Sequence, residues 1–409
     1  MADDSNSSNS NNNNDVGSSG DDSISETSSQ GWLSKLGGAI KGVLIGLVMV
    51  IAAFPLLFWN EGRAVKTAKS LDEGRGAVVT APSDNLNPAN EGKLVHMTGR
   101  AKTTDTVSDP VLGVSANALS LKRKVEMYQW RETAKSEKKD KVGGSTETVT
   151  TYTYAKEWSE SPIESSKFKQ QQGHRNPGSV PYKTEQWTAG KVTLGAYTLT
   201  PTQVGRISGD EPVTAAAPLS NSDTSRPLRE HAGGLYAGQN PEQPQVGDLR
   251  ITFTKVGESD ITIVAKQLGA SFEPYRAKAG ATVDLQRKGI ASADDMFASA
   301  EQSNATMTWI LRGAGFILMA MGIGMMLKPL SVLASVLPFL GDIIGAGTGL
   351  IAFLLAGVMS FTTIAIAWIF YRPLLGAALL LVAGGAVYGV IHLIKKFRAA
   401  RLAPALKTA

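Results

Sequence analysis

The residue types that most often carry chemistry are scarce in this chain. Its 409 residues include no cysteine and only four histidines. The lack of cysteine excludes disulfide bonds, thiolate metal sites and a cysteine nucleophile. His96, His174 and His231 are far apart in the sequence and match neither an HExxH nor a Ser/His/Asp motif, which favours solvated or hydrogen-bonded histidines. We therefore predict no catalytic residue, no metal site and no cofactor, and hence no enzyme.

Two clusters of charged residues have simple structural interpretations. Asp294 and Asp295 could form a metal or acid/base site, but adjacent acids early in a helix are also stabilised by the helix dipole. We interpret the pair as the start of a helix, with Ser292 or Asp294 as its cap. The lysine run 135–141 contains two acidic residues, which favours a solvated hairpin loop over a site for lipid or nucleic acid.

Transport chemistry needs ionisable groups in the middle of the membrane. The charged residues of the apolar segments lie near the segment ends, and the segment 343–371 offers only three hydroxyl side chains at mid-length: Ser360, Thr362 and Thr363. Hydrogen bonds between helices explain these hydroxyls, so a transporter or channel is disfavoured.

Four apolar segments predict transmembrane helices. A bilayer core of roughly 30 Å needs about 20 apolar residues in a helix, and the following segments satisfy this length: 38–60, 307–327, 343–371 and 373–394. The first follows an acidic tail and has no cleavage site, which indicates an uncleaved anchor. The segment 328–342 is apolar but short and contains Pro338, so we predict an interfacial or re-entrant piece.

The remaining segments are polar. Residues 1–31 are an acidic tail of Asn and Ser runs, which we predict to be disordered. Residues 61–306 contain no span and predict a β-rich α+β domain. Alternating apolar residues at 249–268 predict a β-hairpin, and the aromatic runs 120–130 and 148–158 predict a second strand pair around a long lysine-rich loop. Residues 61–73 could continue the first helix as a rigid stem or lie along the headgroups.

Charge predicts the orientation of the four spans. Both termini then share one side, and that side carries most of the flanking basic residues. The positive-inside rule places the termini in the cytosol and the domain 61–306 outside, since long loops are exempt from the rule. The cytosolic tail 395–409 is acid-free, and we expect headgroup contacts from Lys395, Lys396, Arg398 and Arg401. Interfacial aromatic anchors at the outer surface are predicted at Trp59, Trp309, Trp368 and Tyr371.

Glycines recur at short intervals in the apolar segments and allow helix backbones to approach closely. The predicted packing or oligomer interface consists of Gly38, Gly42, Gly46, Gly345, Gly349, Gly385 and Gly389. The spacing leaves open whether these faces pack within one subunit or between subunits.

An ordered series of sequence blocks resembles one family. The blocks are FWNEGRAVKTAKSLDEG at 58–74, RKVEMYQWRE at 123–132, YTYAKEWSESPIESSKF at 152–168 and ITIVAKQLGASFEPY at 261–275. This series, over about residues 32 to 395, is similar to the transmembrane protein 43 (LUMA) family. The resemblance implies four spans, a large extracytosolic domain and no established catalytic activity. Animal members are associated with the inner nuclear and endoplasmic reticulum membranes, where they are thought to act as scaffolds.

Together these observations predict a membrane protein with one N-terminal and three C-terminal transmembrane α-helices around an inserted β-rich domain. We expect a non-enzymatic scaffold that self-associates into a homo-oligomer and organises membrane complexes or lipid domains. Its expected partners are membrane lipids and membrane proteins, not nucleic acid. The alternative is a membrane enzyme or transport accessory with a site in the outer domain. The asparagine/serine tail and the lack of cysteine favour a bacterial inner membrane with a periplasmic domain over the endoplasmic reticulum or inner nuclear membrane.

Overall fold

The computed structural model describes residues 22–142, 144–215, 228–334 and 338–376, together with Ala378 and Leu381. The chain divides into two compact units. The first comprises the N-terminal residues up to Gly31 and Arg100–Asp260, and the second comprises Trp32–Gly99 and the chain from Ile261 onward. The segment 61–306, predicted as one domain, is thus shared between the units, because its two ends belong with the helices.

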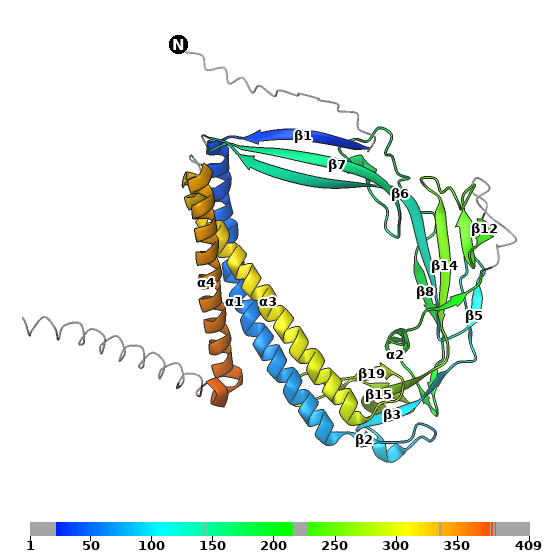
Figure 1. Cartoon of the computed structure of the whole chain (residues 1–409). Helices are drawn as coiled ribbons and strands as arrows, with labels where there is room; N and C mark the ends of the chain where they lie inside the picture. Colours follow the sequence, from blue (N-terminus) through cyan, green and yellow to red (C-terminus); the bar gives the residue numbers. More distant parts are fainter. Residues whose placement is uncertain are drawn as a thin grey trace, which may run out of the picture. The chain divides into compact units, whose positions relative to one another are not determined.

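The first unit is built on an antiparallel sheet with eight strands among the described residues (Figure 1). The main strand order is β1-β7-β6-β14-β13-β12, with β11 on β14 and β8 on β6. The bounds are β1 Ser23–Gln30, β6 Ser120–Asp140, β7 Thr146–Ser159, β8 Glu185–Thr188, β11 Glu211–Val213, β12 Leu228–His231, β13 Gly234–Ala237 and β14 Leu249–Val256. Smaller elements are β4 Thr106–Ser108, β5 Ser115–Asn117, η2 Ser165–Lys167, β9 Thr193–Leu194, β10 Tyr197–Thr198 and α2 Pro201–Gly205.

The strand pair β6–β7 is confirmed, but the lysine-rich loop predicted between the strands is much shorter than expected. Pairing continues through Lys139↔Glu147 to Asp140↔Thr146, so the lysine run lies mostly in β6 itself. The exposed lysines need no loop because the strand gives their backbone groups partners, and Lys141 Nζ lies 2.7 Å from the Glu147 carboxylate.

The hairpin predicted at 249–268 is wrong, although both strands exist. Strand β14 pairs with β6, β11 and β13, whereas β15 (Ser259–Leu268) belongs to the other large sheet. Residues 261–265 are buried at every position, which suits a strand covered on both faces rather than the half-exposed partner of β14.

Strand β1 corrects the prediction of a disordered tail for residues 23–30. It pairs with β7 in an unbroken antiparallel register from Ser23↔Thr153 to Gln30↔Thr146. The strand is fully exposed and almost without apolar residues, so the backbone ladder holds it, assisted by Ser25 Oγ, which lies 3.1 Å from Thr151 Oγ1. Composition cannot reveal such a ladder because it depends on the partner strand.

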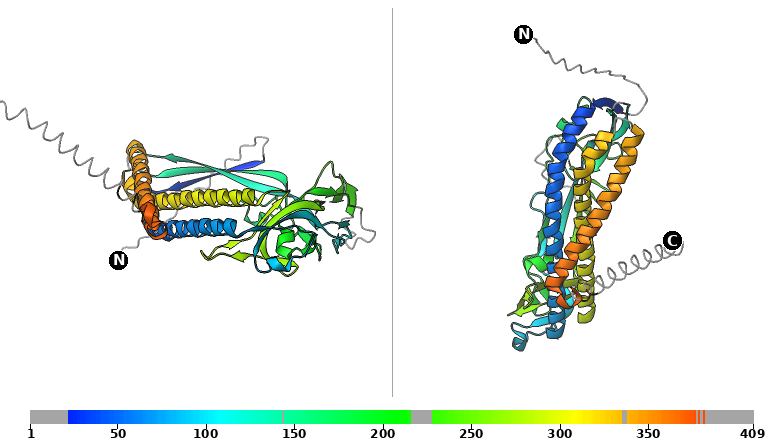
Figure 2. Two further views of the ribbon diagram at one scale, coloured as in Figure 1. Left: turned by 90° about the horizontal axis from the view of Figure 1, so that it is seen from below. Right: turned by 90° about the vertical axis from the view of Figure 1, so that its left-hand side faces the viewer.

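The second unit contains three long helices (Figure 2). Their bounds are α1 Trp32–Ala77, α3 Ala293–Ala334 and α4 Pro338–Tyr371. Among the described residues, these three are long and apolar enough to cross a membrane. The predicted span 373–394 lies outside the described residues except for its first turn, Ala378 and Leu381, and the basic tail 395–409 lies wholly outside them.

Two helices are longer than the predicted spans. Helix α1 continues unbroken to Ala77, so residues 61–73 extend the first helix. Helix α3 begins at Ala293, where Ser292 caps it by accepting from the Asp295 N–H at 3.1 Å. It runs past Pro329 to Ala334, so residues 328–334 are not a separate interfacial piece. The Trp32 indole donates to the Val332 carbonyl at 2.9 Å and ties this last turn to α1.

The stem of the helices packs against strands of the same unit. These strands are β2 Val79–Thr80, β3 Leu94–Lys102, β15, β16 Ser271–Glu273, β17 Tyr275–Arg276, β18 Thr282–Val283 and β19 Leu285–Lys288, with the short helix η1 at Pro88–Asn90. One apolar cluster joins Leu71 of α1 and the fully buried Phe297 of α3 to Val264 and Val283 of the strands. The helices and the strands therefore form one packed body.

Candidate functional site

A buried group of polar side chains lies where the apolar part of α1 ends. The sequence WNEGR occupies 59–63, and the helix turns Asn60 and Glu61 into the bundle while Trp59 stays 57% exposed. Glu61 is 1% exposed and Asn60 is fully buried. Buried polar groups of this kind are stable only when they are fully paired, so their partners define the site.

Glu61 forms a two-pronged ion pair with Arg312 of α3. Its Oε1 accepts from Arg312 Nε at 2.6 Å, and its Oε2 accepts from Arg312 Nη2 at 2.8 Å. The Trp368 indole of α4 donates to the same Oε2 at 2.7 Å. The Arg312 guanidinium also lies 4.7 Å from the ring centre of Trp309 and 5.6 Å from that of Trp368. A single carboxylate thus joins all three helices.

A second set of hydrogen bonds is formed by Asn60 and Arg63, which flank Glu61 on α1. Arg63 donates to the Asn304 side chain at 3.0 Å and to Thr308 Oγ1 at 3.0 Å. Asn60 donates to the Thr308 carbonyl at 3.1 Å, and Asn304 donates to the Ala64 carbonyl at 3.0 Å. We call this set the polar cluster: Asn60, Glu61, Arg63, Asn304, Thr308, Arg312 and Trp368.

The polar cluster has the properties of a structural lock rather than of a reaction centre. It borders a cavity of about 360 Å³, but both Glu61 oxygens already accept hydrogen bonds from Arg312 or Trp368. These three hydrogen bonds occupy most of the roughly four lone-pair positions of the carboxylate, so it is poorly placed to act on a substrate. Among the described residues, no group of three or more His, Cys, Asp or Glu side chains could hold a metal ion.

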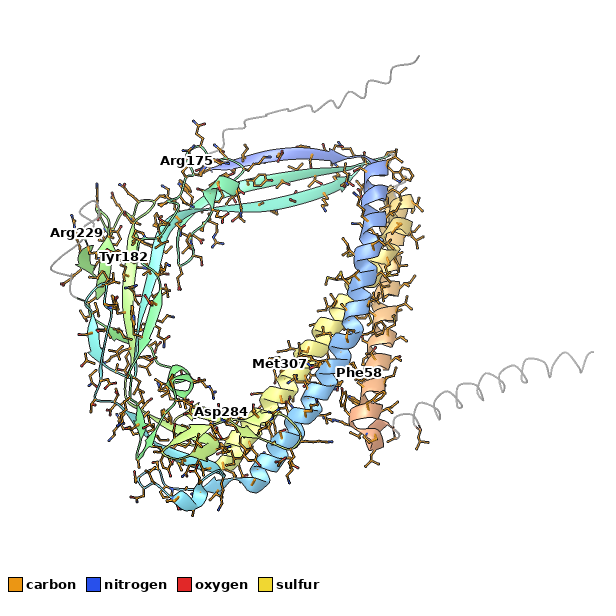
Figure 3. All side chains as sticks on the ribbon, turned by 180° about the vertical axis from the view of Figure 1, so that it is seen from behind. Phe58, Arg175, Tyr182, Arg229, Asp284 and Met307 are labelled. Carbon is orange, nitrogen blue, oxygen red and sulfur yellow. The ribbon has the colours of Figure 1, made fainter. Side chains whose placement is uncertain are left out.

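The predicted aromatic anchors have different surroundings. Trp59 and Trp309 are 57% and 68% exposed, as an interfacial side chain must be. Trp368 instead turns inward to Glu61. Tyr371 packs on Phe58, with ring centres 5.4 Å apart, and covers Gly62. Figure 3 labels Phe58 on α1 beside α4. Sequence analysis missed these inward contacts of Trp368 and Tyr371.

The predicted glycine interface divides into contacts within the chain and open positions. A Cβ on Gly46 would clash with the Gly322 carbonyl oxygen, so α1 and α3 touch by backbone there. Gly42 faces Met325, and Gly345 faces Ser331. Gly38 and Gly349 have no neighbouring atom within 4 Å of an added Cβ. Gly385 and Gly389 lie outside the described residues, as do the predicted headgroup contacts Lys395, Lys396, Arg398 and Arg401.

Two predicted hydrogen-bonded histidines are confirmed. The His96 ring lies 2.9 Å from the Ala291 carbonyl in the second unit. In the first unit, the His174 ring lies 2.8 Å from the Asp22 carboxylate and stacks on Tyr154 at 4.0 Å between ring centres. Tyr154 in turn donates to Glu132 at 2.7 Å. The cluster links the chain just before β1 to the sheet and has no sequence signal, since its members come from distant segments.

Tyr154 makes the first unit sensitive to alkaline pH. Burial, and then the hydrogen bond to Glu132, raise the pKa of Tyr154 from 10.0 to about 12. A raised pKa contributes stability below pH 10.0, and this contribution is lost as the pH rises to about 12. We expect stability to fall over this interval and the fall to be shallower in Tyr154→Phe. Thermal unfolding as a function of pH checks this, and equal slopes for both proteins would contradict it.

The helices and the β-rich segment between them define an integral membrane protein with several candidate spans. The model of the family "Transmembrane protein 43" matches residues 127–373. Human transmembrane protein 43 is 35% identical over 378 residues, which cover 90% of this chain and 93% of the human protein. The rat protein is 34% identical over 367 residues, covering 87% and 91%, and a Drosophila melanogaster homologue is 31% identical over 356 residues, covering 84% and 92%. The chain therefore belongs to the transmembrane protein 43 family.

No solved structure matches this chain. The names of these relatives describe a transmembrane protein and mention no enzymatic activity. The relatives are animal proteins, and they give no support to the bacterial inner membrane favoured by composition.

Proposed function

We propose that this protein is a non-enzymatic membrane scaffold that holds its β-rich part on rigid stems and gathers lipids or membrane proteins around itself. One observation carries the proposal. Helices α1 and α3, of 46 and 42 residues, are continuous from their apolar spans to the strands on which their ends pack. At about 1.5 Å per residue, each is long enough to cross a bilayer and extend well beyond it.

The polar cluster supports this proposal because it stiffens the helices at the base of the stem. Glu61 connects α1 to both α3 and α4, and Arg63 connects α1 to α3 one half-turn further on. The Glu61–Arg312 ion pair resists sliding or rotation of the helices, since a slip would leave a buried charge unpaired. Resistance to movement suits a scaffold better than a transporter, which must change the packing of its helices.

The proposed scaffold acts as a homo-oligomer. Its glycines at 42, 46 and 345 are already in contact within the subunit, so the remaining open helix faces and the β-rich part would supply the contacts between copies. The test is the mass of the particle in lipid nanodiscs, measured by mass photometry. More than one copy per particle is expected. A single copy across the accessible concentrations would remove self-association and leave partner binding as the surviving form of the proposal.

We further propose the orientation in which the termini are cytosolic and the β-rich part lies outside. This orientation is incompatible with the β1–β7 pairing seen in the structure, so in a bilayer either that pairing or the crossing of α1 must give way. Strand β1 ends at Gln30, directly before α1, whereas β7 follows α1 in the chain. If α1 crosses the bilayer, the two strands lie on opposite sides. We expect the crossing of α1 to prevail over the pairing. If β1 stayed paired with β7 while α1 crossed, a polar strand would have to enter the hydrocarbon, where each unpaired backbone polar group costs several kcal/mol.

A pair of introduced cysteines tests this exclusion. Ser25 and Thr151 are register partners in β1 and β7, and Ser136 and Thr150 are register partners in β6 and β7. In lipid vesicles we expect a rapid disulfide in the control Ser136→Cys/Thr150→Cys and none in Ser25→Cys/Thr151→Cys. Gel mobility after maleimide labelling measures both. A disulfide between positions 25 and 151 at the rate of the control would refute the proposed orientation.

A further inference from the structure

A small cavity lies beside α1 just beyond the end of its apolar part, within the second unit. Its volume is about 230 Å³. Helix α1 contributes Trp59, Gly62, Arg63 and Lys66 to the wall, and α4 contributes Tyr371. Of the described residues that line it, two are basic and none is acidic. We call it the basic cavity.

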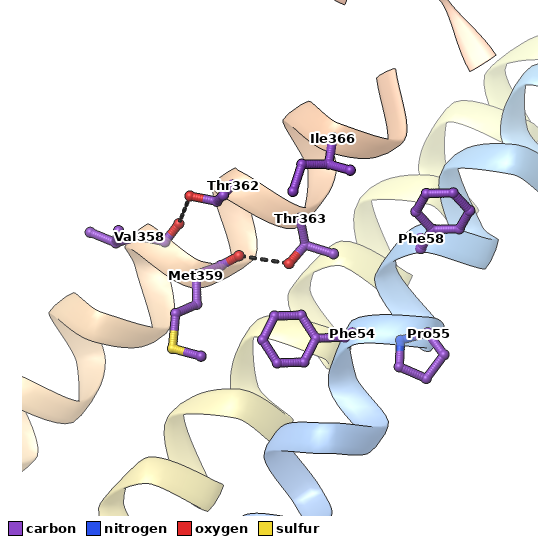
Figure 4. Close-up of a pocket in the computed structure, with 8 residues that line it drawn as sticks. All are labelled: Phe54, Pro55, Phe58, Val358, Met359, Thr362, Thr363 and Ile366. Atoms are coloured by element: carbon purple, nitrogen blue, oxygen red, sulfur yellow. Dashed lines mark hydrogen bonds between the residues drawn. The ribbon is translucent and has the colours of Figure 1, made fainter. Parts of the chain in front are cut away.

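A larger groove of about 470 Å³ between α1 and α4 has a different character (Figure 4). Its lining is apolar apart from Thr362 and Thr363. Their hydroxyls donate to the backbone carbonyls of Val358 and Met359, each at 2.7 Å. Because both hydroxyl protons are used, the groove suits an apolar occupant. Of these two sites, the basic cavity is the one that suits an anion.

The spacing of the α1 residues brings them to the basic cavity together. Arg63 follows Trp59 by four residues, and Lys66 follows Arg63 by three, so all three lie on one face of the helix. Gly62 on the same face has no side chain, and a Cβ there would lie 2.7 Å from the Tyr371 hydroxyl oxygen. The glycine therefore lets the Tyr371 ring reach across to α1 and brings its hydroxyl to the wall of the cavity.

Arg63 is a half-buried cation without a counterion. Its guanidinium donates only to neutral side-chain oxygens, at 3.2, 3.0 and 3.0 Å: those of Asn60, Asn304 and Thr308. Its Nε is buried and has no hydrogen-bond partner among the described residues. Neither Arg63 nor Lys66 forms a salt bridge with a residue in the described part of the chain. Since a charge taken out of water is costly unless it is paired, an anion in the cavity would be stabilising.

The basic cavity lies where α1 meets the headgroups of a bilayer. Trp59 is 57% exposed at the end of the apolar part, as an interfacial anchor must be. Lys66 follows seven residues later, about 10 Å further along the helix at 1.5 Å per residue. The headgroup layer on each side of a bilayer is about 5–7 Å thick, and a lysine side chain can bend back toward it. The nearest abundant anions are therefore lipid phosphates.

We propose that the basic cavity binds the headgroup phosphate of an anionic phospholipid. Arg63 and Lys66 supply the positive charge, and the Tyr371 hydroxyl donates a hydrogen bond to a phosphate oxygen. A zwitterionic headgroup fits less well because its own ammonium group would lie beside two cations. The inference deepens the proposed function, since it names the class of lipid that the scaffold holds. It rests on the crossing of the bilayer by α1 but not on self-association.

Thermal unfolding of the full chain in a non-ionic detergent, titrated with dioleoylphosphatidylglycerol, tests the proposal. A lipid that binds the folded protein raises the unfolding temperature, and the concentration at half-maximal shift measures the affinity. We expect Lys66→Gln to need about fivefold more lipid, the effect of losing one basic residue at a headgroup, and Lys66→Arg to respond like the parent. Tyr371→Phe keeps the ring on Gly62 and should also bind more weakly. Because Lys66 is exposed, Lys66→Gln without lipid should unfold at the temperature of the parent.

The matched control is Lys69→Gln, which removes an exposed lysine that does not line the cavity. It should respond like the parent. Equal weakening in Lys66→Gln and Lys69→Gln would overturn the proposal, because the lipid would then respond only to the general surface charge.

Two other ligands complete the test. An equal shift with dioleoylphosphatidylcholine would overturn the preference for an anionic headgroup, and an equal shift with inorganic phosphate would assign the cavity to free phosphate instead of lipid. The particle mass of Lys66→Gln in nanodiscs should equal that of the parent. An oligomer that shows no response specific to Lys66 would remove this lipid site and leave the scaffold proposal intact.

Discussion

Replacement of Glu61 by alanine is expected to lower the free energy of unfolding by about 3–5 kcal/mol, the cost of leaving one partner of a buried ion pair uncompensated. The Glu61 side chain is 1% exposed and that of Arg312 is 17% exposed, so water replaces the lost partner only in part. The Trp368 indole loses its acceptor as well. Thermal or denaturant unfolding of the protein in nanodiscs measures the effect.

Two comparisons separate the charge effect from loss of volume. Glu301→Ala removes an exposed carboxylate that lies 3.1 Å from Arg75, and it should cost at most about 1 kcal/mol. The double variant Glu61→Leu/Arg312→Met removes both charges and should recover much of the stability lost by Glu61→Ala. A loss below about 1 kcal/mol for Glu61→Ala would contradict the view of the polar cluster as the lock between the three helices.

The contrast between the spans and the polar cluster shows what the sequence can predict here. The apolar segments are local patterns, and their length alone predicts helices that cross a bilayer. Glu61 and Arg312 are 251 positions apart, and each lies near the end of its own apolar segment. Their pairing depends on the packing of α1 against α3, which no local pattern encodes. A buried charge near one end of each of two spans is the only signal that could have suggested it.

The β-rich part shows the same limit in its strand pairing. Alternation correctly predicts that residues 249–256 and 259–268 are strands, but it cannot predict their partners. Two successive strands with a short connection are usually a hairpin, yet here they enter different sheets. Residues 261–265 read ITIVA, a nearly continuous apolar run, and such a run favours a central strand over half of an exposed hairpin.

The glycine spacing in α1 does not tell whether this face packs within one subunit or between subunits. The structure places Gly46 against α3 of the same chain, so Gly46→Leu should destabilise the subunit itself. An added Cβ would clash with the Gly322 carbonyl oxygen and would lie 3.1 Å from Met325 Cβ. The first of these atoms is backbone and cannot rotate away, so α1 and α3 must separate. Separation also opens the contacts of Val50, Leu57 and Met319 in the apolar cluster beside it. We expect a loss of about 3 kcal/mol or more in unfolding free energy, by analogy with overpacked cores.

The matched control is Gly38→Leu in the same helix, where an added Cβ meets no atom within 4 Å. Leucine favours a helix over glycine, so this variant should be as stable as the parent or slightly more stable. Measurement of both unfolding and particle mass then distinguishes the two kinds of packing. An unstable Gly46→Leu protein indicates a contact within the subunit, as the close approach to Gly322 requires. A stable variant that forms a smaller particle would instead place Gly46 between subunits, and the backbone contact between α1 and α3 would have to be abandoned.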